Sequence, residues 1–510
     1  MEGMILFAED SLSEQRLTLD LQEILAEPSD RSPTHRIYAN QTLDLSNIEV
    51  IGFDMDYTLA AYHQREMDRL SIETTIEKLI SNKGYPEALR QVPLDQNFII
   101  RGLVVDKELG NILKMDAHRH VGRCYHGYTQ LPATEVFELY GGRPIPLGSE
   151  RYHWVDTLFS LPEATLLAGI IEHYEKLSGD LPWGYPELFD DIRECIDEAH
   201  SDNSLKAAIL ADLPRFIVKD PDLGPTLHRF RSVGKKLFLL TNSEFYYTEA
   251  VMGYLLNDAL PFYRSWTDFF DLVIVQGAKP NFFTKSQPFH LLDADGNVLN
   301  PADRLKASAV YKGGNLDVLE ANLGHSGKEI LYVGDHMYAD ILRSRKSATW
   351  STALVVQEME DNIRLSQGHL NDLKRINDLA ESARRLDDSI NYNLTLLKSL
   401  SRLQQMMGGL TGPELNAITR TGEEAKEVLD GKRQLQKKVL SELEVLESSI
   451  DQVFNPYWGR LFREGSERSL FGTQVQSFAG IYTSRVSNFL AYSPNQIFRA
   501  PRERMPHERI

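Results

Sequence analysis

Apolar runs alternate with stretches of helical periodicity through the first two thirds of the chain. Residues 48–53 form one such run, and residues 67–82 carry apolar side chains at three- and four-residue spacing, which is typical of an amphipathic helix. Later runs show no apolar–polar alternation and therefore resemble strands buried on both faces of a parallel sheet. They lie at residues 236–243, 270–275, 329–335 and 351–356, the last of which is predicted to end the sheet. Strands that alternate with helices predict an α/β fold with a doubly wound, Rossmann-like parallel sheet.

A long insertion separates the first strand from the second. Residues 98–140 are strand-like, and two helices are predicted at 157–177 and 185–200. Residues 361–405 and 423–453 are charged and helix-prone, and a glycine-rich loop at 407–413 separates them. The predicted parts are an N-terminal arm, 1–47, with one helix at 11–26; a core, 48–60 with 206–360; an inserted α+β cap, 61–205; and a helical C-terminal extension, 361–510, that serves oligomerisation.

Composition narrows the class of protein. The 510 residues include 55 Lys and Arg against 73 Asp and Glu, and this net charge of -18 disfavours binding to a nucleic-acid polymer, which needs a basic face. The two cysteines, Cys124 and Cys195, favour a reducing compartment over a disulfide framework. No apolar run approaches a membrane helix, and the N-terminus does not resemble a signal peptide. We therefore expect a cytoplasmic protein without a membrane segment.

Polar side chains follow four of the predicted strands, where a doubly wound sheet binds its ligands. They are Asp54 and Asp56 after the first strand, Thr241 and Asn242 at the end of the second, Lys279 after the third, and Asp335 and then Asp340 after the fourth. Each strand end alone has an ordinary explanation, because strands finish in polar turn residues. The four together predict a phosphate site, in which one carboxylate attacks phosphorus and another handles protons.

These motifs resemble those of haloacid dehalogenase (HAD) superfamily phosphatases, and more closely those of the cytosolic purine 5′-nucleotidase family. The resemblance rests on residues 53–59 (FDMDYTL), 241–243 (TNS), 278–283 (AKPNFF) and 330–341 (ILYVGDHMYADI). It extends through residues 111–127 and 315–324 to residues 470–475. The aspartate motif is specific for the superfamily, and the longer matches are specific for the nucleotidase branch.

The resemblance implies a role for each carboxylate. Asp54 is the implied nucleophile, which forms an aspartyl-phosphate, and Asp56 is the implied general acid and base. The implied cofactor is Mg²⁺, which prefers oxygen ligands and would be held by the carboxylate of Asp54, the backbone carbonyl of Asp56 and Asp335. Asp340 would support this ligand shell.

Thr241, Asn242 and Lys279 are the implied phosphate-binding residues, and Lys279 also neutralises charge as the transition state forms. The implied reaction is Mg²⁺-dependent hydrolysis of purine nucleoside 5′-monophosphates, chiefly IMP- or GMP-like. Transfer of the phosphoryl group to a second nucleoside would use the same intermediate. Two alternatives stay open: a HAD phosphatase for another phosphomonoester, and a non-catalytic nucleotide sensor or interaction scaffold. The implied assembly is a homo-oligomer, either a dimer or a tetramer.

The predicted cap must recognise the base of the substrate. Arg193, Asp197 and His200 fall at positions i, i+4 and i+7 of its second helix, which puts them on one face. A surface ion pair is the ordinary explanation of such charges. The nucleotidase family places its base-contacting residues on this helix, so the resemblance implies that Arg193 and Asp197 bind a 6-oxopurine and that Phe159 stacks on it. Ser201 stands where animal members have a second aromatic side chain.

Overall fold

The computed structural model describes residues 32–141, 144–178, 181–406, 412–502 and 508. The chain forms two compact units, one of Met1–Glu360 with Leu461–Ile510 and the other of Asp361–Arg460. The predicted C-terminal extension, 361–510, is therefore shared between the two units. The helix predicted at 11–26 lies outside the described residues. Over the ranges described, no helix is both long enough and apolar enough to cross a membrane.

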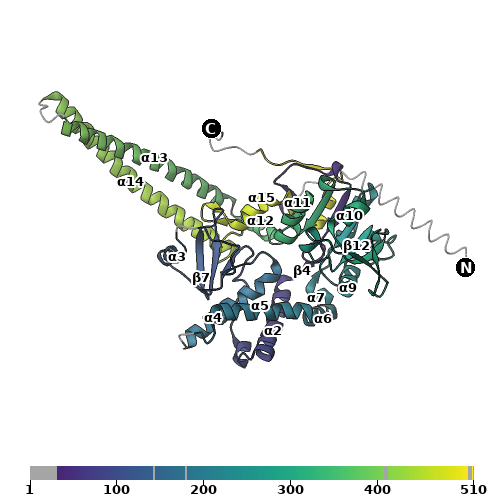
Figure 1. Ribbon diagram of the computed structural model, residues 1–510. Coiled ribbons are helices and arrows are strands. Elements are labelled where there is room, and N and C mark those ends of the chain that lie inside the picture. The colour runs from purple at the N-terminus through teal and green to yellow at the C-terminus, as the bar shows by residue number, and fades with distance from the viewer. Residues whose placement is uncertain (1–31, 142–143, 179–180, 407–411, 503–507, 509–510) are drawn as a thin grey trace, which may run out of the picture. The chain divides into compact units, whose positions relative to one another are not determined.

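In the described part of the chain, a ten-stranded sheet forms the centre of the first unit (Figure 1). In spatial order its strands are β1 (Tyr38–Ala39), β20 (Ile481–Thr483), β17 (Ser351–Val355), β16 (Ile330–Gly334), β3 (Val50–Phe53), β11 (Lys236–Leu240), β12 (Leu272–Val275), β15 (Ala309–Gly313), β13 (Phe289–Leu292) and β14 (Val298–Ala302). The strands from β20 to β15 run parallel, and antiparallel strands complete both edges. The predicted doubly wound α/β fold is confirmed.

β3 lies among the parallel strands, paired with β16 on one side and with β11 on the other. All of its residues are buried, as expected for a strand that is covered on both faces. On one face Gly52 lies opposite Phe238 of β11, and an added Cβ at position 52 would come within 2.1 Å of the Phe238 ring. Glycine at this position therefore allows the ring to pack directly against the strand.

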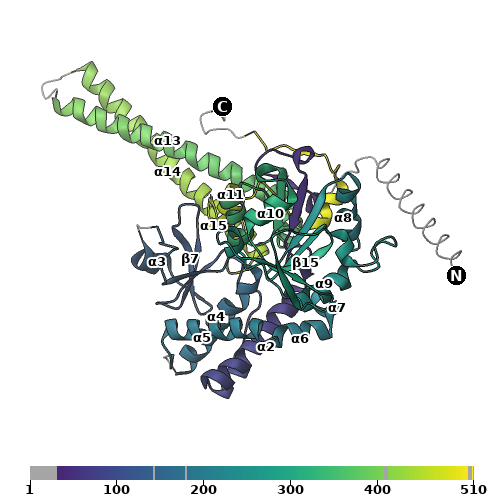
Figure 2. The ribbon, with the colours of Figure 1, turned by 45° about the vertical axis from the view of Figure 1, so that its right-hand side comes forward.

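Helices cover the two sides of the main sheet (Figure 2). On one side, α10 (Leu316–Leu323) and α11 (Arg343–Ala348) contribute to a buried apolar cluster that includes Phe238. On the other side lie α8 (Leu223–Ser232), which packs on β11, and its neighbour α9 (Phe245–Leu256). This arrangement explains why the parallel strands read as unbroken apolar runs.

The sheet extends beyond the strand predicted to be its last. β20 pairs in parallel with β17, and β1, from the predicted N-terminal arm, pairs with β20. β2 (Leu43–Asp44) likewise pairs with β21 (Ile497–Phe498). The prediction that residues 351–356 end the sheet is wrong. The added strands are two or three residues long, so they carry no apolar run, and pairing with distant residues is what stabilises them.

A second sheet lies in the predicted cap region. Among the described residues its antiparallel strands are, in order, β8 (Thr129–Gln130), β7 (Val121–His126), β6 (Asn111–Met115), β5 (Val104–Asp106) and β9 (Tyr152–Trp154). α4 (Leu161–Ser178) contacts β7 of this sheet and packs with α2 (Gln64–Lys83) and α5 (Tyr185–Ser201), and α6 (Ser204–Ala211) packs in turn on α2 and α5. The strand-like prediction for 98–140 is wrong at its end. There α3 (Ala133–Tyr140) begins after Pro132 and buries Val136 and Tyr140, four residues apart.

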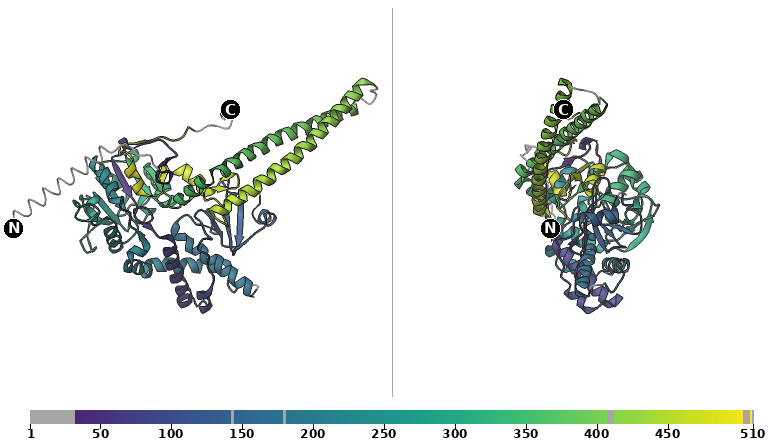
Figure 3. Two further views of the ribbon diagram at one scale, coloured as in Figure 1. Left: turned by 180° about the vertical axis from the view of Figure 1, so that it is seen from behind. Right: turned by 90° about the vertical axis from the view of Figure 1, so that its left-hand side faces the viewer.

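Two long helices form most of the second unit (Figure 3). α13 (Leu370–Met406) and α14 (Pro413–Phe454) pack against each other as a hairpin. Their buried residues recur at three-, four- and seven-residue steps, which is typical of paired helices: Ile376, Leu379, Ala383 and Ile390 on α13, and Ala425 and Leu429 on α14. Two long helices were predicted here. Residues 407–411 of the predicted loop lie outside the described part of the chain.

Asp68 is a buried carboxyl group on α2 whose ionisation opposes folding. Its Oδ1 accepts a hydrogen bond from Nε2 of Gln64 at 2.7 Å, and burial raises the pKa of Asp68 to about 7. A carboxyl group whose pKa rises on folding contributes stability that is present below its unfolded pKa and is lost as the pH rises through the folded value. From an ordinary pKa of 3.8, this loss amounts to at most about 4 kcal/mol.

We expect Asp68→Asn to increase the free energy of unfolding by roughly 1–4 kcal/mol at about pH 8 and to change it little at about pH 3, where the carboxyl group is mostly protonated in both states. Chemical denaturation of both proteins across this range measures the difference. Asp295→Asn, at an exposed position, is the matched control and should have a small effect at every pH. An effect of Asp68→Asn that does not depend on pH would contradict the prediction.

Candidate active site

The carboxyl ends of four neighbouring strands, β12, β11, β3 and β16, bring the predicted polar residues together. Asp54 follows β3 directly, Thr241 follows β11, and Asp335 follows β16. Lys279 lies in the loop after β12. Ligands were expected at the carboxyl ends of the parallel strands, and these side chains meet there.

A tight turn, not a continued strand, connects Asp54 to Asp56. β3 ends just before Asp54, and the backbone N–H groups of Thr58 and Ala60 both donate to the carbonyl of Met55. The alternation of side chains along a strand therefore does not set the directions of the two carboxylates. Burial, and then the charge of Asp54, raise the pKa of Asp56.

Lys279 joins two of the carboxylates. Its Nζ lies 2.8 Å from Oδ1 of Asp54 and 2.7 Å from Oδ1 of Asp340, and it donates to the hydroxyl of Tyr332 at 3.1 Å. Burial disfavours the ammonium form, but the charges of Asp340 and Asp54 outweigh it and raise the pKa of Lys279 well above its usual value. Lys279 is therefore a fixed positive charge in this site.

Three buried carboxylates form a cluster with this lysine. Oxygens of Asp54, Asp335 and Asp340 lie within 4.8 Å of one another. Burial, followed by the charges of its two neighbours, raises the pKa of Asp335 well above its usual value. Burial also raises the pKa of Asp54 to about 7, although Lys279 opposes that rise. Three carboxylates against one ammonium group leave negative charge to be neutralised, and carboxylate oxygens suit Mg²⁺. The side chains present therefore fit a divalent cation.

Asp340 reaches the cluster through an unusual stretch of backbone. It lies on a π-helical turn, Met337–Leu342, a conformation often found at functional sites. Its Oδ2 accepts from the backbone N–H of His336 at 3.2 Å. An added Cβ at Gly334 would lie 2.6 Å from this carboxylate. Glycine at position 334 therefore provides the space that Asp340 fills.

Two hydroxyl groups hold the carboxylate of Asp56. Tyr62 donates to Oδ1 at 2.5 Å and Ser243 donates to Oδ2 at 2.7 Å. The Tyr62 hydroxyl also lies 3.0 Å from the hydroxyl of Tyr247. Ser243 belongs to the motif at residues 241–243 but had no predicted role, and Tyr62 was not predicted. Tyr62 belongs to a strand of only two residues, β4 (Ala61–Tyr62), so no periodicity marked it.

Thr241 and Asn242 lie at the predicted place, but the protein itself engages their side chains. Nδ2 of Asn242 donates to the carbonyl of Lys279 at 3.0 Å, and its Oδ1 accepts from the backbone N–H of Lys279 at 2.6 Å. Oγ1 of Thr241 accepts from the N–H of Ser243 at 3.1 Å. Asn242 therefore clamps the loop that carries Lys279. Contact of Thr241 and Asn242 with phosphate stays a prediction.

Phe159 connects the aspartate turn to the predicted base-reading helix, α5. Its ring centroid lies 4.6 Å from that of Tyr57, which follows Asp56 in the chain. On its other side, the ring of Phe159 lies 5.7 Å from that of His200 on α5. The structure therefore brings these two predicted residues together, and Phe159 contacts the aspartate turn through Tyr57.

Arg193 is fixed by a buried partner. Its Nη1 donates to Oε1 of Glu163 at 2.9 Å, and its Nε lies 3.4 Å from Oδ2 of Asp197. The ion pair that is the ordinary explanation of these charges is therefore present. Contact of Arg193, Asp197, His200 and Phe159 with a base stays a prediction.

Arg101 is a buried residue of the site that sequence analysis missed. Its Nη1 donates to the backbone carbonyl of Asp335 at 3.2 Å, and its Nε and Nη2 donate to Glu358 at 2.9 and 2.6 Å. Its guanidinium group lies 4.9 Å from the ring centroid of Phe471, on α15 (Leu470–Phe478). Arg101 thus ties the loop of Asp335 to a distant segment, and no local pattern links the two.

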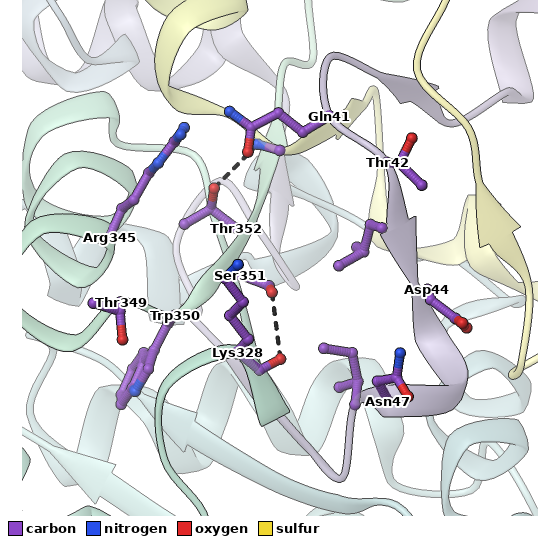
Figure 4. A pocket seen from close by; sticks show the side chains of 13 residues that line it. Gln41, Thr42, Asp44, Asn47, Lys328, Arg345, Thr349, Trp350, Ser351 and Thr352 are labelled. Atoms are coloured by element: carbon purple, nitrogen blue, oxygen red, sulfur yellow. Dashed lines mark hydrogen bonds between the residues drawn. The ribbon is translucent and has the colours of Figure 1, made fainter.

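A cavity of about 490 Å³ opens at the amino ends of several strands of the main sheet (Figure 4). Its lining includes Asn47 before β3, Lys328 before β16, and Ser351 and Thr352 at the start of β17. These positions are the amino ends of the strands, and the predicted site residues do not line the cavity. It is therefore separate from the carboxylate cluster.

The sequence is similar to those of known 5′-nucleotidase proteins. A model of the 5′ nucleotidase family matches residues 37–510. A 5′-nucleotidase domain-containing protein of Dictyostelium discoideum is 31% identical over 481 residues, which cover 92% of this chain and 74% of that protein. 5′-Nucleotidase domain-containing protein 2 of Rattus norvegicus is 30% identical to this chain over 486 residues, which cover 92% of this chain and 80% of that protein.

A solved structure titled as a predicted phosphoglycolate phosphatase from Haemophilus somnus 129pt has 13% identity to this chain. The match covers 61% of this chain and 86% of the chain in that structure, with a TM-score of 0.26. The family match over most of the chain and the two relatives show the family without it: this chain belongs to the 5′ nucleotidase family and is a phosphohydrolase.

Proposed function

We propose that the protein is a Mg²⁺-dependent 5′-nucleotidase that hydrolyses purine nucleoside 5′-monophosphates through an aspartyl-phosphate on Asp54. The observation that carries the proposal is the cluster of three buried carboxylates with Lys279 at the carboxyl ends of parallel strands. Mg²⁺ would be held by Asp54, Asp335 and the backbone carbonyl of Asp56, with Asp340 in support. When bound, it neutralises negative charge on the carboxylates and on the phosphate.

In the proposed first step, a carboxylate oxygen of Asp54 attacks phosphorus. The bond between phosphorus and the 5′ oxygen of the nucleoside breaks, and Asp56 gives that oxygen its proton. Lys279 lies beside the attacking carboxylate and can neutralise charge on the transferring phosphoryl group. Tyr62 and Ser243 hold the carboxyl group of Asp56 through both of its oxygens, which orients it toward its task.

In the proposed second step, a water molecule attacks phosphorus of the aspartyl-phosphate. Asp56 accepts a proton from that water, the bond between phosphorus and the Asp54 oxygen breaks, and inorganic phosphate and the original carboxylate result. A nucleoside hydroxyl in place of water would give phosphotransfer by the same chemistry. The proposal therefore includes phosphotransfer as a second activity of this site.

The proposed base preference rests on α5. Arg193 would donate to the 6-oxo group of the purine and Asp197 would accept from the ring N1–H, which favours hypoxanthine and guanine over adenine. Glu163 supports this role because it anchors the guanidinium group at 2.9 Å. Phe159 would stack on the base and His200 would line the same face, since their rings already contact each other.

We also infer a homo-oligomer, a dimer or a tetramer, and a cytoplasmic location. Support for the oligomer comes from the family resemblance. Support for the location comes from Cys124 and Cys195, which are free and buried.

A panel of 5′-monophosphates tests the proposed substrate class. With Mg²⁺ present, we expect phosphate release from IMP and GMP to exceed release from AMP, and EDTA to abolish all three activities because the carboxylates lose their counter-charge. A sugar phosphate used in preference to every nucleotide would refute the proposed base contacts. Activity that persists in EDTA would refute the proposed metal.

Replacement of Asp54 tests the covalent route. Asp54→Asn keeps the size of the side chain but removes the nucleophile, so turnover should fall by more than about 10³-fold. Nucleotide binding, measured by calorimetry, should persist. With radiolabelled substrate, the parent protein should retain a hydroxylamine-labile phosphoryl label that the variant lacks. Hydrolysis by Asp54→Asn at the parent rate would rule out the assignment.

Replacement of Tyr62 tests the role of Asp56. Tyr62→Phe removes one of its two hydroxyl donors, so kcat/KM for a nucleoside monophosphate should fall about 10- to 100-fold. The loss should be much smaller for p-nitrophenyl phosphate, because nitrophenolate leaves without a proton. Tyr247→Phe, which leaves both donors to Asp56 in place, is the matched control. Equal losses on the two substrates would show that Tyr62 does not act through the general acid.

A further inference from the structure

α14 carries a second regular stripe beside the one that packs on α13. The outer stripe, as we call it, consists of Val428, Gly431, Leu435, Lys438, Glu442, Val445, Ser449 and Gln452. Its members are spaced alternately three and four residues apart, as are the core positions of a coiled coil. Val428, Leu435 and Val445 are 46%, 51% and 68% exposed, so the outer stripe presents branched apolar side chains to solvent.

The outer stripe borders a groove of about 950 Å³ on the hairpin. Lys438, Glu442 and Val445 of α14 line it, together with Arg375 of α13. Arg375 donates to Oε1 of Glu442 at 2.6 Å and so fixes that carboxylate on the stripe. Among the described residues, no ion pair involves Lys438. The stripe therefore combines apolar side chains with one anchored anion and one cation that is available to pair.

The sequence of the outer stripe is complementary to itself in the reverse direction. When a second copy is laid antiparallel about residue 440, Lys438 meets Glu442 of the other copy, and Leu435 meets Val445 of the other copy. Gly431 in the same way meets Ser449, a small side chain against a small one. In a two-fold contact each of these pairs occurs twice.

A parallel arrangement of the two α14 helices is disfavoured by charge repulsion. In register, it would place Lys438 against Lys438 and Glu442 against Glu442, and like charges face to face oppose association. The charge pattern therefore selects the antiparallel direction, while the apolar residues provide the contact. Between residues 428 and 452 the stripe is about 36 Å long at the rise of an α-helix.

We propose that the outer stripe of α14 is a contact surface between two copies of this chain. The two α14 helices run antiparallel, with the two-fold axis near residue 440. The contact lies in the hairpin unit and does not depend on the proposed substrate.

Cysteine cross-linking tests the direction and register of this contact. One protein carries Leu435→Cys and a second carries Val445→Cys; the natural Cys124 and Cys195 are buried and give little background. After mild oxidation, a mixture of the two should form a disulfide-linked dimer, and Leu435→Cys alone should not. Lys426→Cys, on the opposite face of α14, is the control partner for Val445→Cys. No dimer in the mixture, or an equal dimer from Leu435→Cys alone, would overturn the proposal.

Charge reversal tests the pairing of Lys438 with Glu442. In the cross-linking background, Lys438→Glu should weaken association about tenfold or more, because two like-charged pairs replace two ion pairs. Adding Glu442→Lys together with Arg375→Glu, which keeps an ion pair within the hairpin, should recover most of the cross-linked product. Lys426→Glu is the matched control and should have no effect. Helix content measured by circular dichroism reports whether the hairpin is folded in each variant. Failure of the combined exchange to recover the product in folded protein would exclude the pairing.

Discussion

Three carboxylates and one ammonium group share a buried space, and the rest of the first unit, Met1–Glu360 with Leu461–Ile510, is organised around that constraint. Like charges this close repel each other, and burial adds a cost of several kcal/mol for each ion. Such a cluster persists only when rigid structure holds it. Parallel strands buried on both faces supply that rigidity, and the carboxylates lie where the strands end. Lys279 offsets part of the charge, and a divalent cation would offset more.

Contacts around the cluster also hold its residues in place. Asn242 grips the backbone of Lys279, Gly334 leaves the space for Asp340, and Arg101 holds the carbonyl of Asp335. Asp56 lies outside the cluster and is held by hydroxyl groups instead of an ammonium group. Two carboxylates in one turn therefore experience different surroundings, a condition under which such pairs take different chemical roles.

Five neighbouring parallel strands, β17, β16, β3, β11 and β12, and the polar residues at their ends were predictable because each leaves a local trace. A strand buried on both faces reads as an apolar run, and a polar motif directly after it is visible in one dimension. The contacts of Tyr62 and Arg101 leave no such trace, since one lies in a two-residue strand and the other pairs with residues far along the chain. The short strands β1 and β20 were missed because they too pair with residues far along the chain. α3 was misread because its short apolar pattern fits either period.

The position of β20 also bears on how the protein is made. In space it pairs with β17, but in the chain the whole hairpin unit, Asp361–Arg460, separates them. A nascent chain on the ribosome must therefore carry β17 as an open sheet edge while the hairpin is synthesised. Open edges expose unpaired backbone groups to other chains. Phe471, which Arg101 contacts beside the loop of Asp335, also emerges only after the hairpin. We therefore expect the first unit to stay incomplete, with an exposed sheet edge, until the segment beyond the hairpin has been synthesised.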